Sequence, residues 1–108
     1  MPRERFQTLS EPMYYVLLAL MEECCGVDIM NKAVDISGGR VIVGPGTVYA
    51  MLEKFLKSGV IRETSGRGSQ GRKRSYRIAD YGKDLLRAEY VRLEVMVSDG
   101  RRILEERP

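Results

Sequence analysis

Apolar residues recur at helical spacing in the N-terminal part of the chain and predict two helices there. Residues 13–21 are almost wholly apolar, and Ser10 and Pro12 stand where an N-cap and a first-turn proline favour the start of a helix. A second helix is expected over residues 26–37, with the glycine pair at 38–39 as its stop. Because the first helix is apolar nearly all round, it must be covered on more than one side.

A third helix is expected after a short extended piece at 40–43. Pro45 suits its first turn and Gly59 its end. One face of this helix is apolar, formed by Val48, Leu52, Phe55 and Leu56. Three consecutive helices therefore precede a change of pattern.

The pattern then becomes that of a β-hairpin, because residues 60–64 and 72–78 are short β-type runs on either side of a glycine-rich loop. That loop, GRGSQG at 66–71, has the G-x-G-x-x-G spacing of a dinucleotide-binding turn. Such a turn needs a helix N-terminus directly after it, whereas a strand is expected here. The loop is therefore interpreted as the tip of a hairpin.

A long helix is expected from Asp80 onward, because apolar positions step by three and four residues as far as Leu104. Residues 80–106 would span roughly 40 Å as a helix, more than the roughly 30 Å width of such a domain. Part of the stripe therefore needs a second chain to cover it, unless the helix breaks at Gly100. The expected dimer contacts are Leu86, Tyr90, Leu93, Met96 and Val97.

Composition narrows the class of protein. The chain has 108 residues, enough for one domain, with 44% hydrophobic and 31% charged residues. No apolar run approaches the roughly 18 residues of a membrane-spanning helix, and no secretory signal is visible at the N-terminus. A cytoplasmic protein without a membrane partner is expected.

The candidate chemistry for catalysis is sparse. The chain has no histidine, and its two cysteines, Cys24 and Cys25, are neighbours that are too close to form an ordinary disulfide. One is expected to be a small buried residue and the other to lie at a helix end. The acid pairs at 22–23 and 105–106 have no accompanying base or nucleophile. We therefore expect no enzyme, no metal site and no cofactor.

Positive charge gathers in the predicted hairpin. Residues 62–77 contain six arginines and lysines and one acid, Glu63, which gives a net charge of +5 where the whole chain has +3. Such a concentration favours a polyanionic partner, although cations in a solvated loop also serve solubility.

The order of elements, three helices and a basic hairpin, is typical of a winged helix-turn-helix, a mainly α fold with a small β-hairpin. We expect a DNA-binding domain over 1–79 and a dimerisation helix over 80–108. The third helix has short or polar residues on the face away from its apolar stripe, suited to base edges and phosphates: Thr47, Tyr49, Ala50, Lys54 and Lys57. The wing adds four phosphate contacts: Arg67, Arg72, Lys73 and Arg74.

Three stretches resemble the PadR family of bacterial transcriptional regulators: LSEPMYYVLLALMEE, DIMNKAVDISGGRVIVGPGTVYAMLEKFLKSGVI and RKRSYRIADYGKDLLRAEYVRLEVMVSDGRRIL. The resemblance covers nearly the whole chain, and GPGTVY at 44–49 is its most diagnostic piece. It implies a winged-helix repressor that dimerises through a single C-terminal helix, binds double-stranded DNA at an inverted-repeat operator and is often released by a small effector.

The chain departs from the family pattern in three places. Val27 stands where an aromatic residue is common, which weakens a phosphate contact at the start of the second helix. Ala79 stands where threonine is common, so that Asp80 is expected to be the N-cap of the long helix. No tryptophan is present for an aromatic ligand platform. The rival function is an interaction module that binds RNA or a protein, since a fold alone does not fix function.

Overall fold

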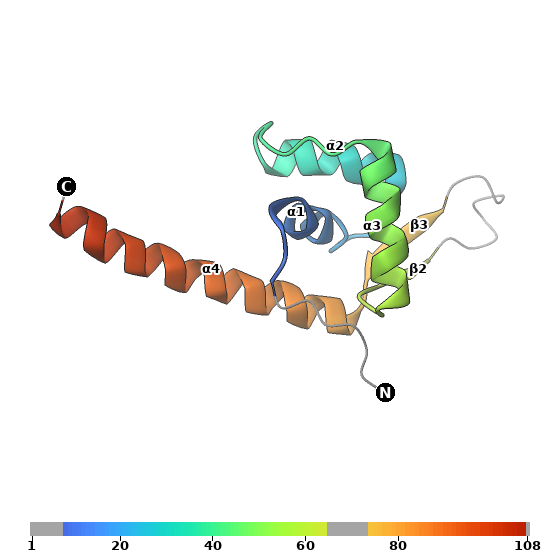
Figure 1. Cartoon of the computed structure of the whole chain (residues 1–108). Helices are drawn as coiled ribbons and strands as arrows, with labels where there is room; N and C mark the ends of the chain where they lie inside the picture. The colour runs from blue at the N-terminus through green and yellow to red at the C-terminus, as the bar shows by residue number, and fades with distance from the viewer. Residues whose placement is uncertain (1–7, 65–73, 108) are drawn as a thin grey trace.

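Four helices and three short strands make up the fold in the computed structural model, which describes residues 8–64 and 74–107. Three helices form a compact head, and the fourth projects away from it (Figure 1). The helices and strands are α1 (Glu11–Ala19), β1 (Cys24–Cys25), α2 (Gly26–Ile36), α3 (Pro45–Lys57), β2 (Ile61–Glu63), β3 (Ser75–Ile78) and α4 (Asp80–Glu106). The expected fold class, a mainly α winged helix-turn-helix with a long C-terminal helix, is confirmed.

The first three helices begin where local signals predict, and α2 and α3 also end there, whereas α1 ends at Ala19, before the apolar run does. The Ser10 side chain caps α1 by accepting a hydrogen bond from the Met13 amide at 3.3 Å. After α2 the chain turns through Gly38 and Gly39, and after α3 through Gly59, all three with positive φ. The core between these helices is centred on side chains without solvent exposure, among them Leu17, Leu20, Ile29, Val48 and Phe55.

The sheet differs from the expected simple hairpin, because it has a third strand. Its order is β1-β3-β2, and both pairs are antiparallel. β1 pairs Cys24 with Tyr76 and so ties the turn after α1 to the hairpin. The short extended piece expected at 40–43 is not a strand of this sheet. Val41 and Val43 are buried there and Ile42 is 80% exposed, so the alternating pattern reflects a loop laid on the core.

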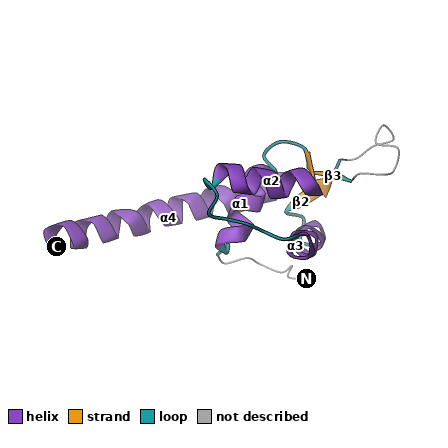
Figure 2. Ribbon diagram, turned by 90° about the horizontal axis from the view of Figure 1, so that it is seen from above, coloured by secondary structure: helices purple, strands orange, loops and turns teal. Residues whose placement is uncertain are grey.

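The long helix α4 is continuous from Asp80 to Glu106, so the alternative of a break at Gly100 is wrong. Its far end and the β2–β3 hairpin lie at opposite ends of the molecule, which measures 58 Å along its longest axis (Figure 2). Its N-cap is Ala79, not Asp80 as expected. Ala79 is still extended and its amide donates to the Val60 carbonyl at 2.9 Å, which fixes it outside the helix. Asp80 then occupies the first turn, where its negative charge interacts favourably with the helix dipole.

Candidate nucleic-acid interface

Helix α3 presents an exposed polar face next to the hairpin. Its Val48, Leu52 and Phe55 are buried in the head, which turns the opposite face to solvent. The predicted reading residues Thr47, Ala50, Lys54 and Lys57 are all exposed on that side. Helix and hairpin lie side by side at the end of the molecule away from the C-terminus (Figure 1).

The fifth residue predicted on α3, Tyr49, is 47% exposed and lies against the first residue of α2. A Cβ atom built on Gly26 would be 2.7 Å from Tyr49 Cζ, so the ring packs on bare backbone. The hydroxyl therefore lies beside a helix N-terminus, whose free amides favour anions. Tyr49 was predicted from the sequence, whereas the packing of its ring on the Gly26 backbone was not.

The outward face of the hairpin carries two arginines directly opposite each other. Arg62 and Arg77 are Cα partners across β2 and β3, and both are exposed. Within the described residues, neither has an ion-pair partner. Like charges in this position destabilise a sheet in isolation, and an anion bound beside them would offset this repulsion. Both arginines belong to the basic run predicted at 62–77, but their pairing could not be predicted, because the register of a hairpin depends on its turn.

The four predicted wing residues divide into two groups. Arg67, Arg72 and Lys73 lie outside the described residues. Arg74 is described and forms two hydrogen bonds to Glu63, from Nη2 to Oε1 at 2.6 Å and from Nε to Oε2 at 3.0 Å. The structure thus gives Arg74 a partner within the hairpin.

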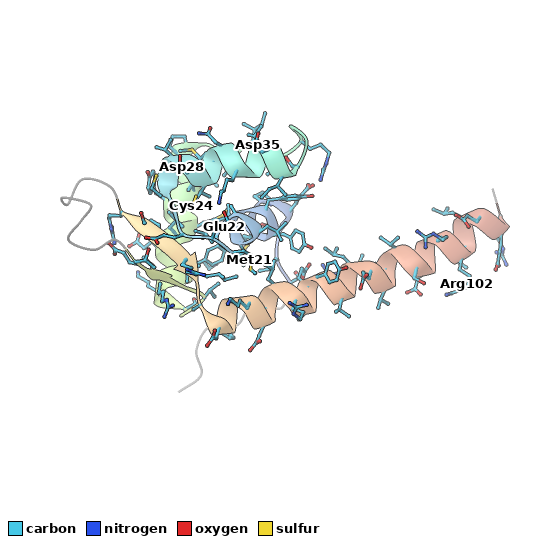
Figure 3. All side chains as sticks on the ribbon, turned by 180° about the vertical axis from the view of Figure 1, so that it is seen from behind. Met21, Glu22, Cys24, Asp28, Asp35 and Arg102 are labelled. Carbon is cyan, nitrogen blue, oxygen red and sulfur yellow. The ribbon has the colours of Figure 1, made fainter. Side chains whose placement is uncertain are left out.

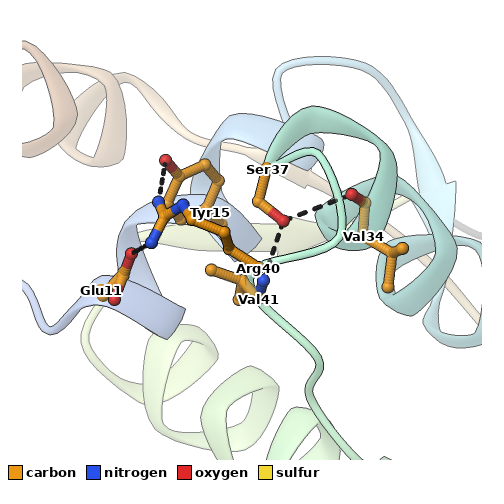
Figure 4. A network of polar contacts seen from close by, with 6 residues as sticks. All are labelled: Glu11, Tyr15, Val34, Ser37, Arg40 and Val41. Carbon is orange, nitrogen blue, oxygen red and sulfur yellow. Dashed lines mark hydrogen bonds and ion pairs between the residues drawn. The ribbon is translucent and has the colours of Figure 1, made fainter.

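Polar contacts hold the connection between α2 and α3 against α1. Arg40 donates to Glu11 Oε2 at 2.5 Å and to the Tyr15 hydroxyl at 3.0 Å (Figure 4). Ser37 accepts the Val41 amide at 2.9 Å and donates to the Val34 carbonyl at 3.2 Å. The helix-turn-helix is therefore held by polar contacts as well as by its core.

The predicted dimer residues of α4 lie in different environments. Leu86 is only 7% exposed and belongs to the core of its own head. Leu93 is half-buried, whereas Tyr90, Met96 and Val97 are about half exposed. Further along, the helix has no head beside it, as the distant position of Arg102 shows (Figure 3). The stripe is thus covered at its start and open beyond Leu93.

A groove runs between α1 and α4. Three clefts of 340, 370 and 260 Å³ adjoin Tyr14, which lines all three. Tyr90 lines the two larger clefts, and Lys83 and Arg87 border the first. Tyr14 was not predicted as a site residue. It lies in a helix that is apolar on all sides, so the sequence pattern does not show which face of the helix lines a cleft.

The two cysteines have the contrasting environments that the sequence predicted. Cys24 is buried, and Cys25 is half-buried at the N-cap position of α2, with its Sγ 3.4 Å from Asp28 Oδ2. Burial raises the pKa of the Cys24 thiol to about 11. Residues 8–64 and 74–107 contain no group of side chains able to hold a metal ion. Over the same residues, no helix is long and apolar enough to cross a membrane.

A winged helix with an exposed α3 and a cationic hairpin defines a DNA-binding protein of the helix-turn-helix class. Residues 16–88 match the model of the transcriptional regulator PadR-like family. The chain belongs to this family and is a DNA-binding transcriptional regulator, which confirms the resemblance seen in the sequence. Regulators of this family are transcription factors, so the expectation of a protein without enzymatic activity is also confirmed.

Solved structures agree on the fold. A PadR family transcriptional regulator from Eggerthella lenta has a TM-score of 0.71 at 21% identity, over 85% of this chain and 80% of that one. A transcriptional regulator from Clostridium thermocellum has a TM-score of 0.66 at 15% identity, over 90% of both chains. A PadR family regulator from Clostridium difficile has a TM-score of 0.64 at 22% identity, over 84% of this chain and 97% of that one. No curated protein matches the chain at a significant level.

Proposed function

We propose that the protein is a homodimeric, sequence-specific regulator that reads its operator with α3 and contacts the DNA backbone with the hairpin. The observation that carries the proposal is the exposed face of α3 beside the like-charged pair Arg62 and Arg77. Thr47 and Ala50 suit thymine methyl groups, and Lys54 suits a guanine edge or a phosphate. Tyr49 donates to a phosphate at the start of α2.

The proposed dimer uses the part of α4 that its own head leaves uncovered. Tyr90, Leu93, Met96 and Val97 extend the stripe beyond the head, and the groove between α1 and α4 adds Tyr14. A two-fold dimer matches an inverted repeat with half-sites about 10 base pairs apart. Leu86 contributes by supporting the start of α4 from within the core.

We further propose that the regulator is a repressor released by a small effector. The first cleft between α1 and α4 supports this role, because its volume of 340 Å³ falls at the lower end of the range of known ligand pockets. Two tyrosines and two cations line the first cleft, which favours an aromatic or anionic compound. Release of a bound duplex on addition of such compounds is the corresponding test.

Gel mobility on duplex DNA from the region upstream of the gene tests the main proposal. We expect binding with a log-log salt slope of roughly −5 to −10, because a dimer with several phosphate contacts per subunit releases that many counterions. RNA of the same sequence should compete poorly, since the A-form major groove is too narrow for α3. A slope near zero, or RNA that competes as well as DNA, would contradict the proposal and favour an interaction module.

A further inference from the structure

The base of the hairpin contains an ion pair between the last residue of β2 and the residue before β3. Glu63 ends β2, and Arg74 directly precedes β3. Two nitrogens of the guanidinium meet the two carboxylate oxygens at 2.6 and 3.0 Å. This two-point geometry fixes the direction of both side chains, as a single contact would not.

The ion pair is supported from below by an aromatic ring. The Arg74 guanidinium lies 5.8 Å from the centre of the Tyr76 ring, and Tyr76 is only 2% exposed. Glu63 is the Cα partner of Tyr76 across the two strands. The Glu63 carboxylate also raises the pKa of Arg74. Arg74 is therefore held between a carboxylate and a ring that is itself fixed in the core.

A second contact fixes the point at which the chain leaves β2. The Thr64 amide donates to the Ser75 carbonyl at 2.8 Å, which closes the ladder. The Thr64 hydroxyl donates to Glu23 Oε2 at 2.8 Å, in the turn between α1 and β1. Thr64 and Arg74, the residues on either side of the hairpin loop, are thus each bonded to an acidic side chain, Glu23 and Glu63 respectively.

We propose that Glu63 is a positioning residue for DNA binding, which holds Arg74 at the base of the hairpin and fixes the point where β2 ends beside the start of β3. This inference rests on the proposed function. It predicts an effect opposite to that of simple electrostatics. Removal of an acid from a basic surface should strengthen DNA binding by charge alone, whereas loss of a positioning acid should weaken it.

The first test compares two variants that lose the same charge. Glu63→Gln should weaken duplex binding about two- to fivefold per wing, the range that exposed ion pairs contribute. Asp35→Asn, at an exposed position near the end of α2, should leave the affinity unchanged or slightly raised. A Glu63→Gln protein that binds DNA as tightly as Asp35→Asn, or more tightly, would overturn the proposal.

The second test separates a role within the wing from a phosphate contact. Arg74→Gln should weaken binding without changing the salt slope, since Arg74 is directed to Glu63. Loss of a phosphate contact would instead lower the slope by about 0.9 per subunit. The exchange Glu63→Arg with Arg74→Glu keeps the net charge and should recover affinity relative to either single variant. A flattened slope together with no recovery would show that Arg74 acts on the DNA.

A third measurement needs no DNA. Hydrogen exchange of the Thr64 amide in the free protein reports the order of the hairpin base. Exchange should be several times faster in Glu63→Gln and unchanged in Asp35→Asn. Equal exchange in both variants would overturn the proposal even if DNA binding fell. If the parent protein bound no duplex DNA, the proposed function would fail, and this measurement would still decide whether Glu63 orders the base of the hairpin.

Discussion

The ring of Tyr49 rests on Gly26, so the side chain that we propose contacts a phosphate depends on a residue of another helix. Gly26→Ala should displace the Tyr49 ring, because a Cβ atom would lie 2.7 Å from Tyr49 Cζ. The ring is half exposed and can turn toward solvent, so the loss of stability should be at most about 1 kcal/mol. The variant should also lose operator affinity as Tyr49 is displaced. Thermal unfolding and a binding titration measure the two effects.

Gly46→Ala is the matched control for stability. Gly46 lies in α3, and no atom lies within 4 Å of a Cβ atom built there. Alanine should raise stability by up to about 1 kcal/mol at such a helical position. If Gly26→Ala binds the operator as tightly as Gly46→Ala and the parent, the packing of Tyr49 on α2 does not position a DNA contact.

Cys24 and Cys25 should differ sharply in reactivity although they are neighbours. Burial raises the pKa of Cys24 to about 11, so at pH 8 only about one molecule in a thousand carries its thiolate. A thiol reagent should therefore modify one cysteine in the folded protein and two after denaturation. The folded-state reaction should disappear in Cys25→Ser. Two fast-reacting thiols in the native protein would contradict the burial of Cys24.

The environment of single residues was predictable where a local signal was sufficient. Ser10 caps α1 as expected, because a cap needs only the next three residues. Asp80 was expected to cap α4, but Ala79 does so, because a hydrogen bond from its amide to Val60 decides its conformation. Leu86 was assigned to a dimer although it is buried in its own head. Periodicity identifies an apolar face and does not tell which chain covers it.

Among the elements, β1 shows why a strand can escape sequence analysis. It has two residues, and its pairing with Ser75 and Tyr76 joins positions about 50 residues apart. No alternating pattern is possible over two residues, and the only local signal is the buried Cys24. The helices and the β2–β3 hairpin were predictable because each contains several turns or a matching pair of runs. The tie between Glu63 and Arg74 needed the strand register.

Helix α3 should carry the specificity of the regulator. Alanine substitution at Lys54 or Thr47 should cost about 1–3 kcal/mol on the operator and leave binding to random duplex nearly intact, because base contacts discriminate and phosphate contacts do not. Competition titrations with operator and random DNA measure the difference. Variants that bind both duplexes as the parent does would show that another element reads the sequence.

At the level of the whole molecule, α4 extends well beyond the head that packs against its first turns. Its apolar stripe continues through Val97 to Leu104, which is 70% exposed. A surface of this length has no cover within the described chain, which supports a second copy. The opposite face of the same helix has two isolated apolar residues, Val91 and Val95, which are about half exposed. This face offers a control for the dimer.

Leu93→Glu should dissociate the dimer, because the acid would be buried without a partner between two chains, at a cost of several kcal/mol. Val95→Glu places the same charge two residues further on, about 200° around the helix, and should leave the dimer intact. Light scattering should give about 25 kDa for the parent and the control, twice the 12.3 kDa chain, and a lower mass for Leu93→Glu. Circular dichroism shows whether each variant keeps its helices, since an obligate dimer often has no stable monomer. A folded parent that runs as a monomer at micromolar concentration, or equal dissociation of both variants, would contradict a dimer formed through this stripe and the two-fold operator that follows from it.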